Sequence, residues 1–138
     1  MVNLLYTASN AGVQIQLLVR GICRLKPGVK NQSENIEVKR IVDRYLEHGR
    51  IFYFYNDGKP LLLAGSADWM ERNIHRRIEV CFPVSDPLHQ NMLIEIMNLQ
   101  WSDNVKATAI DTSTLSYAER NKAAIRSQEE IWKRIKNA

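Results

Sequence analysis

One histidine carries much of the chemistry that this sequence offers. His48 lies in the stretch 45–55, which we interpret as a helix end, a tight turn and a buried strand. Apolar residues between Ile36 and Leu46 recur at near-helical spacing and Gly49 is a typical helix stop, so we predict that His48 closes that helix. The negative end of a helix dipole favours a protonated imidazole. His48 is therefore a candidate proton donor or phosphate ligand.

Basic side chains close to predicted element ends provide the rest of the chemistry. Arg20 directly follows residues 13–19, which alternate and then turn wholly apolar, as a central strand buried on both faces would. Ligands of open α/β sheets bind beyond the carboxyl ends of the strands, so Arg20 is a candidate anion ligand; an arginine that merely closes the strand is an equally good interpretation. Guanidinium forks match phosphate oxygens, which favours a phosphate site. The candidate cations are Arg20, Arg24, Lys26, Arg50, Arg72, Arg76 and Arg77.

A tight turn organises the middle of the chain. The sequence Asn-Asp-Gly-Lys-Pro at 56–60 predicts a hairpin between the runs 51–55 and 61–64. Ser66 is expected to cap a short helix, whose N-terminus is a second candidate anion site. Asp86, which is followed by proline, is expected to cap a longer helix.

The alternation of strands and helices predicts an α/β fold, with a mixed β-sheet flanked by helices on both faces. We expect residues 1–138 to form a single domain. The other predicted elements are a helix from Val2 to a stop at Gly12, strands at 78–84 and 105–110, and a last helix opened by a capping box of Ser116 with Glu119.

Composition limits the class of protein. The formal net charge is +4, which is compatible with a polyanionic partner, and 45% of the residues are hydrophobic, enough for one core. Cys23 and Cys81 lie in apolar contexts and are expected to be reduced core residues. No apolar run approaches the ~20 residues of a membrane span, so we expect a soluble, cytoplasmic protein. The helical pattern begins at Met1, which suggests a fragment of a longer protein.

Familiar catalytic and metal-binding motifs are absent. None of the three histidines pairs with Cys, Asp or Glu at metal-ligand spacing, and we predict that His75 and His89 are exposed. The sequence contains no Walker-type glycine loop, no GxSxG elbow and no Cys-His nucleophile motif. The remaining chemistry is cationic, and it suits phosphoryl transfer, which depends mainly on positioning and charge neutralisation.

Four stretches in register resemble the final catalytic domain of bacterial polyphosphate kinase, which is related in fold to phospholipase D. They are LVRGICRLKPG at 18–28, DRYLEHGRI at 43–51, SADWM at 66–70 and RRIEV at 76–80. The resemblance extends over essentially the whole chain. It implies an enzyme that reversibly transfers the terminal phosphate of ATP to polyphosphate through a phosphorylated histidine. That nucleophile and the magnesium-binding residues belong to a preceding domain, so this fragment is expected to hold half of the site and to be inactive alone.

The resemblance also implies roles for particular residues. Arg20 and His48 match the two positions in this domain that contact ATP. Arg20 would neutralise phosphate charge, and His48 would donate a hydrogen bond or a proton to the bridging oxygen as ADP leaves. The six other cations are weaker candidates for a polyphosphate channel, and for each a solvated surface position or an ion pair with Glu47, Asp68 or Glu79 is at least as good an interpretation. The expected partners are ATP or ADP, polyphosphate and the remaining domains, with no specific nucleic acid. An oligomeric or membrane-associated full-length enzyme is left open.

Two other functions remain open. The pairs His48 with Arg50 and Ser66 with Asp68 resemble a degraded form of the H-x-K and G-S-x-N pattern of phospholipase D, with arginine in place of lysine and aspartate in place of asparagine. A phosphodiesterase would use His48 as nucleophile, and a covalent phosphate on His48 would reveal it. A non-catalytic polyanion-binding module would instead bind polyphosphate and nucleic acid alike, in a salt-sensitive manner.

Overall fold

The computed structural model describes residues 1–110, 115–117 and 123–136, which fall into two compact units. The first unit comprises Met1–Glu47 with Asn98–Ala138, and the second comprises His48–Met97. Each unit has a small β-sheet of its own, so the predicted α/β class is confirmed while the strands divide between two sheets.

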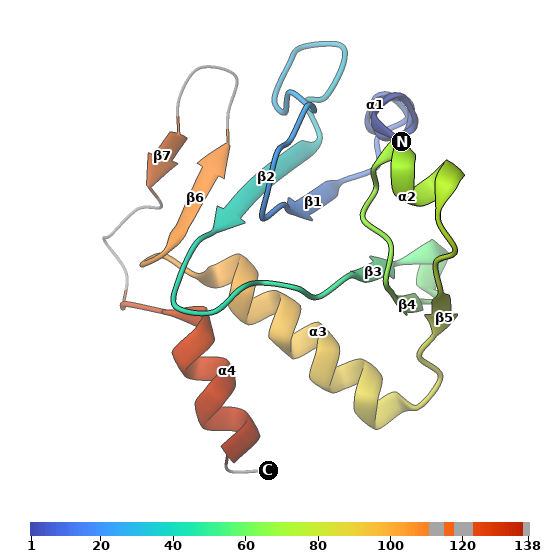
Figure 1. Ribbon diagram of the computed structural model, residues 1–138. Helices are drawn as coiled ribbons and strands as arrows, with labels where there is room; N and C mark the ends of the chain where they lie inside the picture. The colour runs from blue at the N-terminus through green and yellow to red at the C-terminus, as the bar shows by residue number, and fades with distance from the viewer. Residues whose placement is uncertain (111–114, 118–122, 137–138) are drawn as a thin grey trace. The chain divides into compact units, whose positions relative to one another are not determined.

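The sheet of the first unit has the strand order β1-β2-β6-β7 (Figure 1). Its strands are β1 (Ile15–Leu18), β2 (Ile36–Ile41), β6 (Ala107–Ile110) and β7 (Leu115–Tyr117). β1 pairs with β2 in parallel, whereas β2 with β6 and β6 with β7 are antiparallel, so the sheet is mixed as predicted. The prediction that residues 13–19 form a central, doubly buried strand was wrong, because β1 is an edge strand with half-buried side chains.

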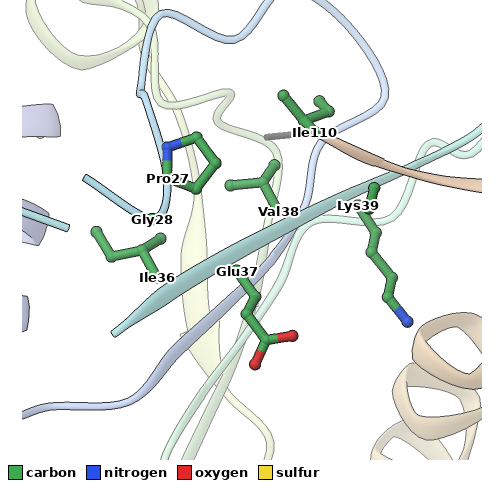
Figure 2. Close-up of a pocket in the computed structure, with 8 residues that line it drawn as sticks. Pro27, Gly28, Ile36, Glu37, Val38, Lys39 and Ile110 are labelled. Carbon is green, nitrogen blue, oxygen red and sulfur yellow. The ribbon is translucent and has the colours of Figure 1, made fainter. Parts of the chain in front are cut away.

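The prediction of a helix from Ile36 to His48 was wrong. Ile36, Val38 and Ile41 are buried while Glu37 is exposed, which is the alternation of a strand. Figure 2 shows the side chains of Ile36 and Val38 on one face of β2 and those of Glu37 and Lys39 on the other. β-Branched side chains favour extended backbone, which is consistent with a strand in this segment. No helix ends at His48, so the dipole argument for its protonation does not apply.

Helix α1 (Val2–Asn10) is confirmed, and its apolar face packs on the core of the first unit. That core contains Leu25, Ile36 and Val38. The predicted stop at Gly12 is also confirmed, since Gly12 has a φ of +89° and its N–H donates to the Ser9 carbonyl.

Helix α4 (Ser127–Lys136) begins later than predicted. Ser116 lies in β7, so the prediction that it opens the last helix was wrong, and Glu119 lies outside the described residues. The buried carboxylate of Asp103 holds the start of α4 instead, because it accepts hydrogen bonds from the N–H and the hydroxyl of Ser127 at 2.8 and 2.7 Å. None of the described helices is both long and apolar enough to cross a lipid bilayer.

The sheet of the second unit is antiparallel, in the order β3 (Ile51–Phe54), β4 (Leu61–Gly65) and β5 (Cys81–Pro83). The predicted hairpin is confirmed: its turn includes the short 3-10 helix η1 (Asn56–Gly58), whose three residues all have positive φ. Cys81 is exposed, which corrects its placement in the core, whereas Cys23 is half-buried and packs on the core of the first unit.

Two helices follow β4 in the chain. The short helix α2 (Glu71–Arg76) has Met70 at its N-cap position, so the prediction that Ser66 caps it was wrong. Helix α3 (Pro87–Ser102) begins as predicted, because Oδ1 of Asp86 accepts from the backbone N–H groups of Leu88 and His89.

Candidate active site

His48 is exposed and lies on irregular backbone just before β3. Its partner is Arg50, two residues further along the chain. The Nη1 atom of Arg50 lies 2.6 Å from Nδ1 of the imidazole, 3.2 Å from Nε2 and 2.8 Å from the His48 carbonyl oxygen. One guanidinium nitrogen therefore contacts both the ring and the backbone of the histidine.

The opposite side of the Arg50 guanidinium is ion-paired. Its Nη2 and Nε lie 3.0 and 3.1 Å from Oδ1 of Asp68, and the arginine side chain is only 13% exposed. Arg50 and Asp68 are also the two positions that depart from the phospholipase D pattern, so the two departures contact each other. Arg50 is thus a partly buried, paired cation, which weakens its assignment to a polyphosphate channel.

Ser66 joins a second polar group in the same unit. Its hydroxyl donates to Oε2 of Glu79, and Asn73 donates to Oε1 of Glu79 at 2.8 Å. Hydrogen bonds from Ser66 and then Asn73 lower the pKa of Glu79, so this carboxylate is ionised. The backbone N–H of Val80 donates to the Ser66 hydroxyl at 3.1 Å, which fixes the serine between β4 and β5 instead of at a helix start.

Gly65 brings these strands closer than a side chain would allow. A Cβ atom there would lie 2.8 Å from the carbonyl oxygen of Val80 and 3.4 Å from Cα of Cys81. We expect Gly65→Ala to shift the backbone of Ser66 and to lower the free energy of unfolding by about 1–3 kcal/mol in urea denaturation. Gly49→Ala is the control, because a Cβ there would meet only Cδ1 of Ile51, at 3.9 Å. Equal losses in the two variants would contradict the steric explanation.

Arg20 belongs to the first unit and is half-buried. Its Nη1 donates to the carbonyl oxygen of Glu47 at 3.2 Å. The Nε and Nη2 groups of Arg20 make no hydrogen bond to any other described residue.

Glu47 was considered only as an ion-pair partner for a cation, and the structure assigns it amide partners. Gln100 donates to Oε2 of Glu47 at 2.7 Å, and Gln128 of α4 donates to Oε1 at 2.7 Å. The Gln128 side chain also bonds both the N–H and the carbonyl of Tyr45. These contacts fix the backbone that carries the Arg20 acceptor.

An ion pair between Arg126 and Asp43 also holds the segment that contains Tyr45 and Glu47. Nε and Nη2 of Arg126 donate to the two carboxylate oxygens of Asp43 at 2.8 and 2.6 Å, and the Asp43 side chain is 2% exposed. The hydrogen bonds from Arg126 lower the pKa of Asp43 against the opposing effect of burial. No local sequence signal pointed to this pair, since its members are 83 residues apart.

The other candidate cations do not all line one pocket. Arg72 and Arg76, one turn apart on α2, line a pocket of about 280 Å³ together with Met70 and Glu71. Arg24, Lys26 and Arg77 are exposed. A different pocket, of about 240 Å³, lies on the first sheet beside Pro27, Ile36 and Val38 and includes none of the candidate phosphate ligands (Figure 2). His75 and His89 are exposed, as predicted.

We found no candidate set of metal ligands in the described part of the chain. Those residues contain no group of three or more His, Cys, Asp or Glu side chains placed to hold a metal ion. His48 of the second unit offers a hydrogen-bonding imidazole, and Arg20 of the first unit offers a positively charged guanidinium.

Sequence comparison connects this arrangement to a family. The family profile described as "Polyphosphate kinase C-terminal domain 2" matches residues 1–128. A polyphosphate kinase of Vibrio cholerae serotype O1 is 48% identical over 139 aligned residues, which cover 99% of this chain and 20% of that protein. A polyphosphate kinase of an Exiguobacterium species is 58% identical over 103 residues, covering 75% of this chain and 14% of that protein.

Structural comparison gives the same result. The crystal structure of polyphosphate kinase from Porphyromonas gingivalis matches with a TM-score of 0.94 and 45% sequence identity, covering 99% of this chain and 21% of that one. The expected phospholipase D-like α/β fold agrees with this match. The chain spans about a fifth of the length of the Vibrio relative.

Proposed function

This chain belongs to the polyphosphate kinase family, and we propose that it contributes half of an active site that reversibly transfers the γ-phosphate of ATP to polyphosphate. The match of the family profile to residues 1–128 is the observation that carries this proposal. ATP or ADP and polyphosphate are its substrates, and the chain acts in the cytoplasm as one domain of a longer enzyme. The nucleophilic histidine, which becomes phosphorylated, and any magnesium site are supplied by another domain.

His48 and Arg20 are the residues of this chain that act on ATP. Arg20 neutralises phosphate charge through the Nε and Nη2 groups, which make no hydrogen bond to another described residue. His48 donates a hydrogen bond to the oxygen that bridges the β- and γ-phosphates, where negative charge develops as ADP leaves. The exposed imidazole and the half-buried guanidinium are both accessible for these roles.

Arg72 and Arg76 are the best-supported candidates for the polyphosphate channel. They line one pocket together, and each is exposed. Only positive charge supports a channel role for Arg24, Lys26 and Arg77. Arg50 is better explained by its ion pair with Asp68.

Kinase assays on single variants of the full-length enzyme that carries this domain test the proposal. We expect His48→Ala and Arg20→Ala each to lower kcat for ATP-dependent chain growth by about 10²–10³-fold, because each loses a group that stabilises developing charge. Circular dichroism should be unchanged. Arg44→Ala, which removes an exposed arginine four residues before His48, is the matched control and should keep normal turnover. Normal turnover of the His48→Ala enzyme would remove His48 from the mechanism.

A further inference from the structure

Arg50 contacts the imidazole in a way that constrains its chemistry. A guanidinium has only donors, so a ring nitrogen that forms a hydrogen bond with it has to accept. A protonated imidazole has no acceptor, and a neutral imidazole has one. Nη1 of Arg50 lies 2.6 Å from Nδ1 and 3.2 Å from Nε2, and a neutral imidazole can accept at only one of them, so the nearer Nδ1 is taken as the acceptor. The ring proton then lies on Nε2.

Asp68 and the neighbouring backbone hold Arg50 in this position. The carboxylate binds Nη2 and Nε of Arg50, which leaves Nη1 to face His48. The Arg50 carbonyl accepts the N–H of Gly65 at 3.0 Å, so β3 and β4 are paired beside it. Trp69, next to Asp68, stacks on Phe52 with ring centroids 5.1 Å apart. These contacts hold the donor in place directly before β3.

From this geometry we infer that His48 works as a neutral hydrogen-bond donor through Nε2–H, oriented by Asp68 and Arg50 as positioning residues, and that it transfers no proton. This inference rests on the proposed function. The Nε2–H bond stays intact while its dipole faces the oxygen that gains charge as the bond to the γ-phosphate breaks. A neutral imidazole that gave up this proton would become an imidazolate, which is strongly disfavoured. ADP then leaves with its negative charge stabilised by hydrogen bonding and by cations.

Replacing His48 by glutamine distinguishes hydrogen bonding from proton transfer. The side-chain amide of glutamine presents an N–H near the place of Nε2–H, but it is no proton donor at neutral pH. In the full-length enzyme we expect His48→Gln to keep kcat within about tenfold of the unmodified enzyme, while His48→Ala loses about 10²–10³-fold. Equal losses in the glutamine and alanine variants would overturn the inference and leave the proposed function intact. Normal turnover in both variants would remove His48 from the mechanism and overturn the inference with it.

A double-mutant cycle tests the positioning role of Arg50. We expect Arg50→Met to lower kcat with an unchanged KM for ATP, and Arg50→Lys to restore part of the loss because lysine can still donate to Nδ1. In the His48→Gln background Arg50→Met should have no further effect on kcat, since no imidazole remains to be oriented. A phosphate-binding arginine would instead raise KM, or keep its full effect in that background, and either result would overturn the inference. Asp68→Asn should lower kcat in the same direction as Arg50→Met.

Discussion

Replacing Asp103 by alanine is expected to lower the free energy of unfolding by about 3–5 kcal/mol. The carboxylate is 1% exposed. Its Oδ1 accepts the N–H groups of Val105, Lys106 and Ala107 at 2.7–3.1 Å, and its Oδ2 accepts the N–H and the hydroxyl of Ser127. Alanine would leave these donors without an acceptor at the start of both β6 and α4. Urea denaturation followed by tryptophan fluorescence measures the loss.

Asp86→Ala is the matched control for this change. Asp86 also accepts two backbone N–H groups, but its side chain is 57% exposed, so water can replace it. Its removal should cost about 0.5–2 kcal/mol, as for an ordinary helix N-cap. Equal losses in the two variants would show that burial of Asp103 adds nothing to its hydrogen bonds.

The stabilisation by Asp103 should depend on pH with a definite sign. Burial raises the pKa of this carboxyl group, but the hydrogen bonds from Lys106, Ser127 and Val105 together outweigh it and hold the pKa below the ordinary 3.8. A carboxyl whose pKa is lower in the folded state stabilises the fold fully above 3.8, and that stabilisation is lost as the pH falls through the lowered value. The difference between the unmodified chain and Asp103→Ala should therefore shrink below pH 3.8. A constant difference would contradict this explanation.

Local signals in the sequence predicted the parts of the fold that depend on local interactions. The turn at Asn56–Gly58 requires positive φ at three consecutive residues, which the Asn-Asp-Gly sequence tolerates, and the hairpin follows from it. Asp86 caps α3 because its side chain reaches the N–H groups two and three residues ahead. In both cases, interactions between residues a few positions apart in the sequence are sufficient to predict the element.

Other elements depended on partners that are distant in sequence. Residues 36–46 have apolar spacing that fits a helix about as well as a strand, and pairing of β2 with β1 and β6 decided for the strand. Ser116 pairs with Ala109 across β6 and β7, which overrode its capping-box pattern. Asp68, which is ion-paired with Arg50, lies 18 residues away across a strand pair that no local pattern reveals.

Replacing Arg126 by alanine should loosen the segment that leads to His48 without touching that histidine. The Asp43 carboxylate is 2% exposed, and Arg126 binds both of its oxygens, so the variant leaves a buried charge with only the N–H of Arg44. We expect Tm of the chain to fall by about 5 °C or more. Loss of the hydrogen bonds from Arg126 should also raise the pKa of Asp43, since burial then opposes ionisation with less compensation. An NMR titration of the carboxyl carbon measures that change.

The same variant has a local readout at Tyr45, whose N–H donates to Gln128 two residues beyond Arg126. Amide hydrogen exchange at Tyr45 should accelerate, because the start of α4 is no longer anchored to Asp43. Lys133→Ala removes an ion pair on the same helix, with Glu130, in which the lysine side chain is 59% exposed. It should change neither Tm nor Tyr45 exchange, since exposed pairs contribute little. If Lys133→Ala accelerates exchange at Tyr45 as much as Arg126→Ala, α4 as a whole holds the segment, and the buried pair has no special role.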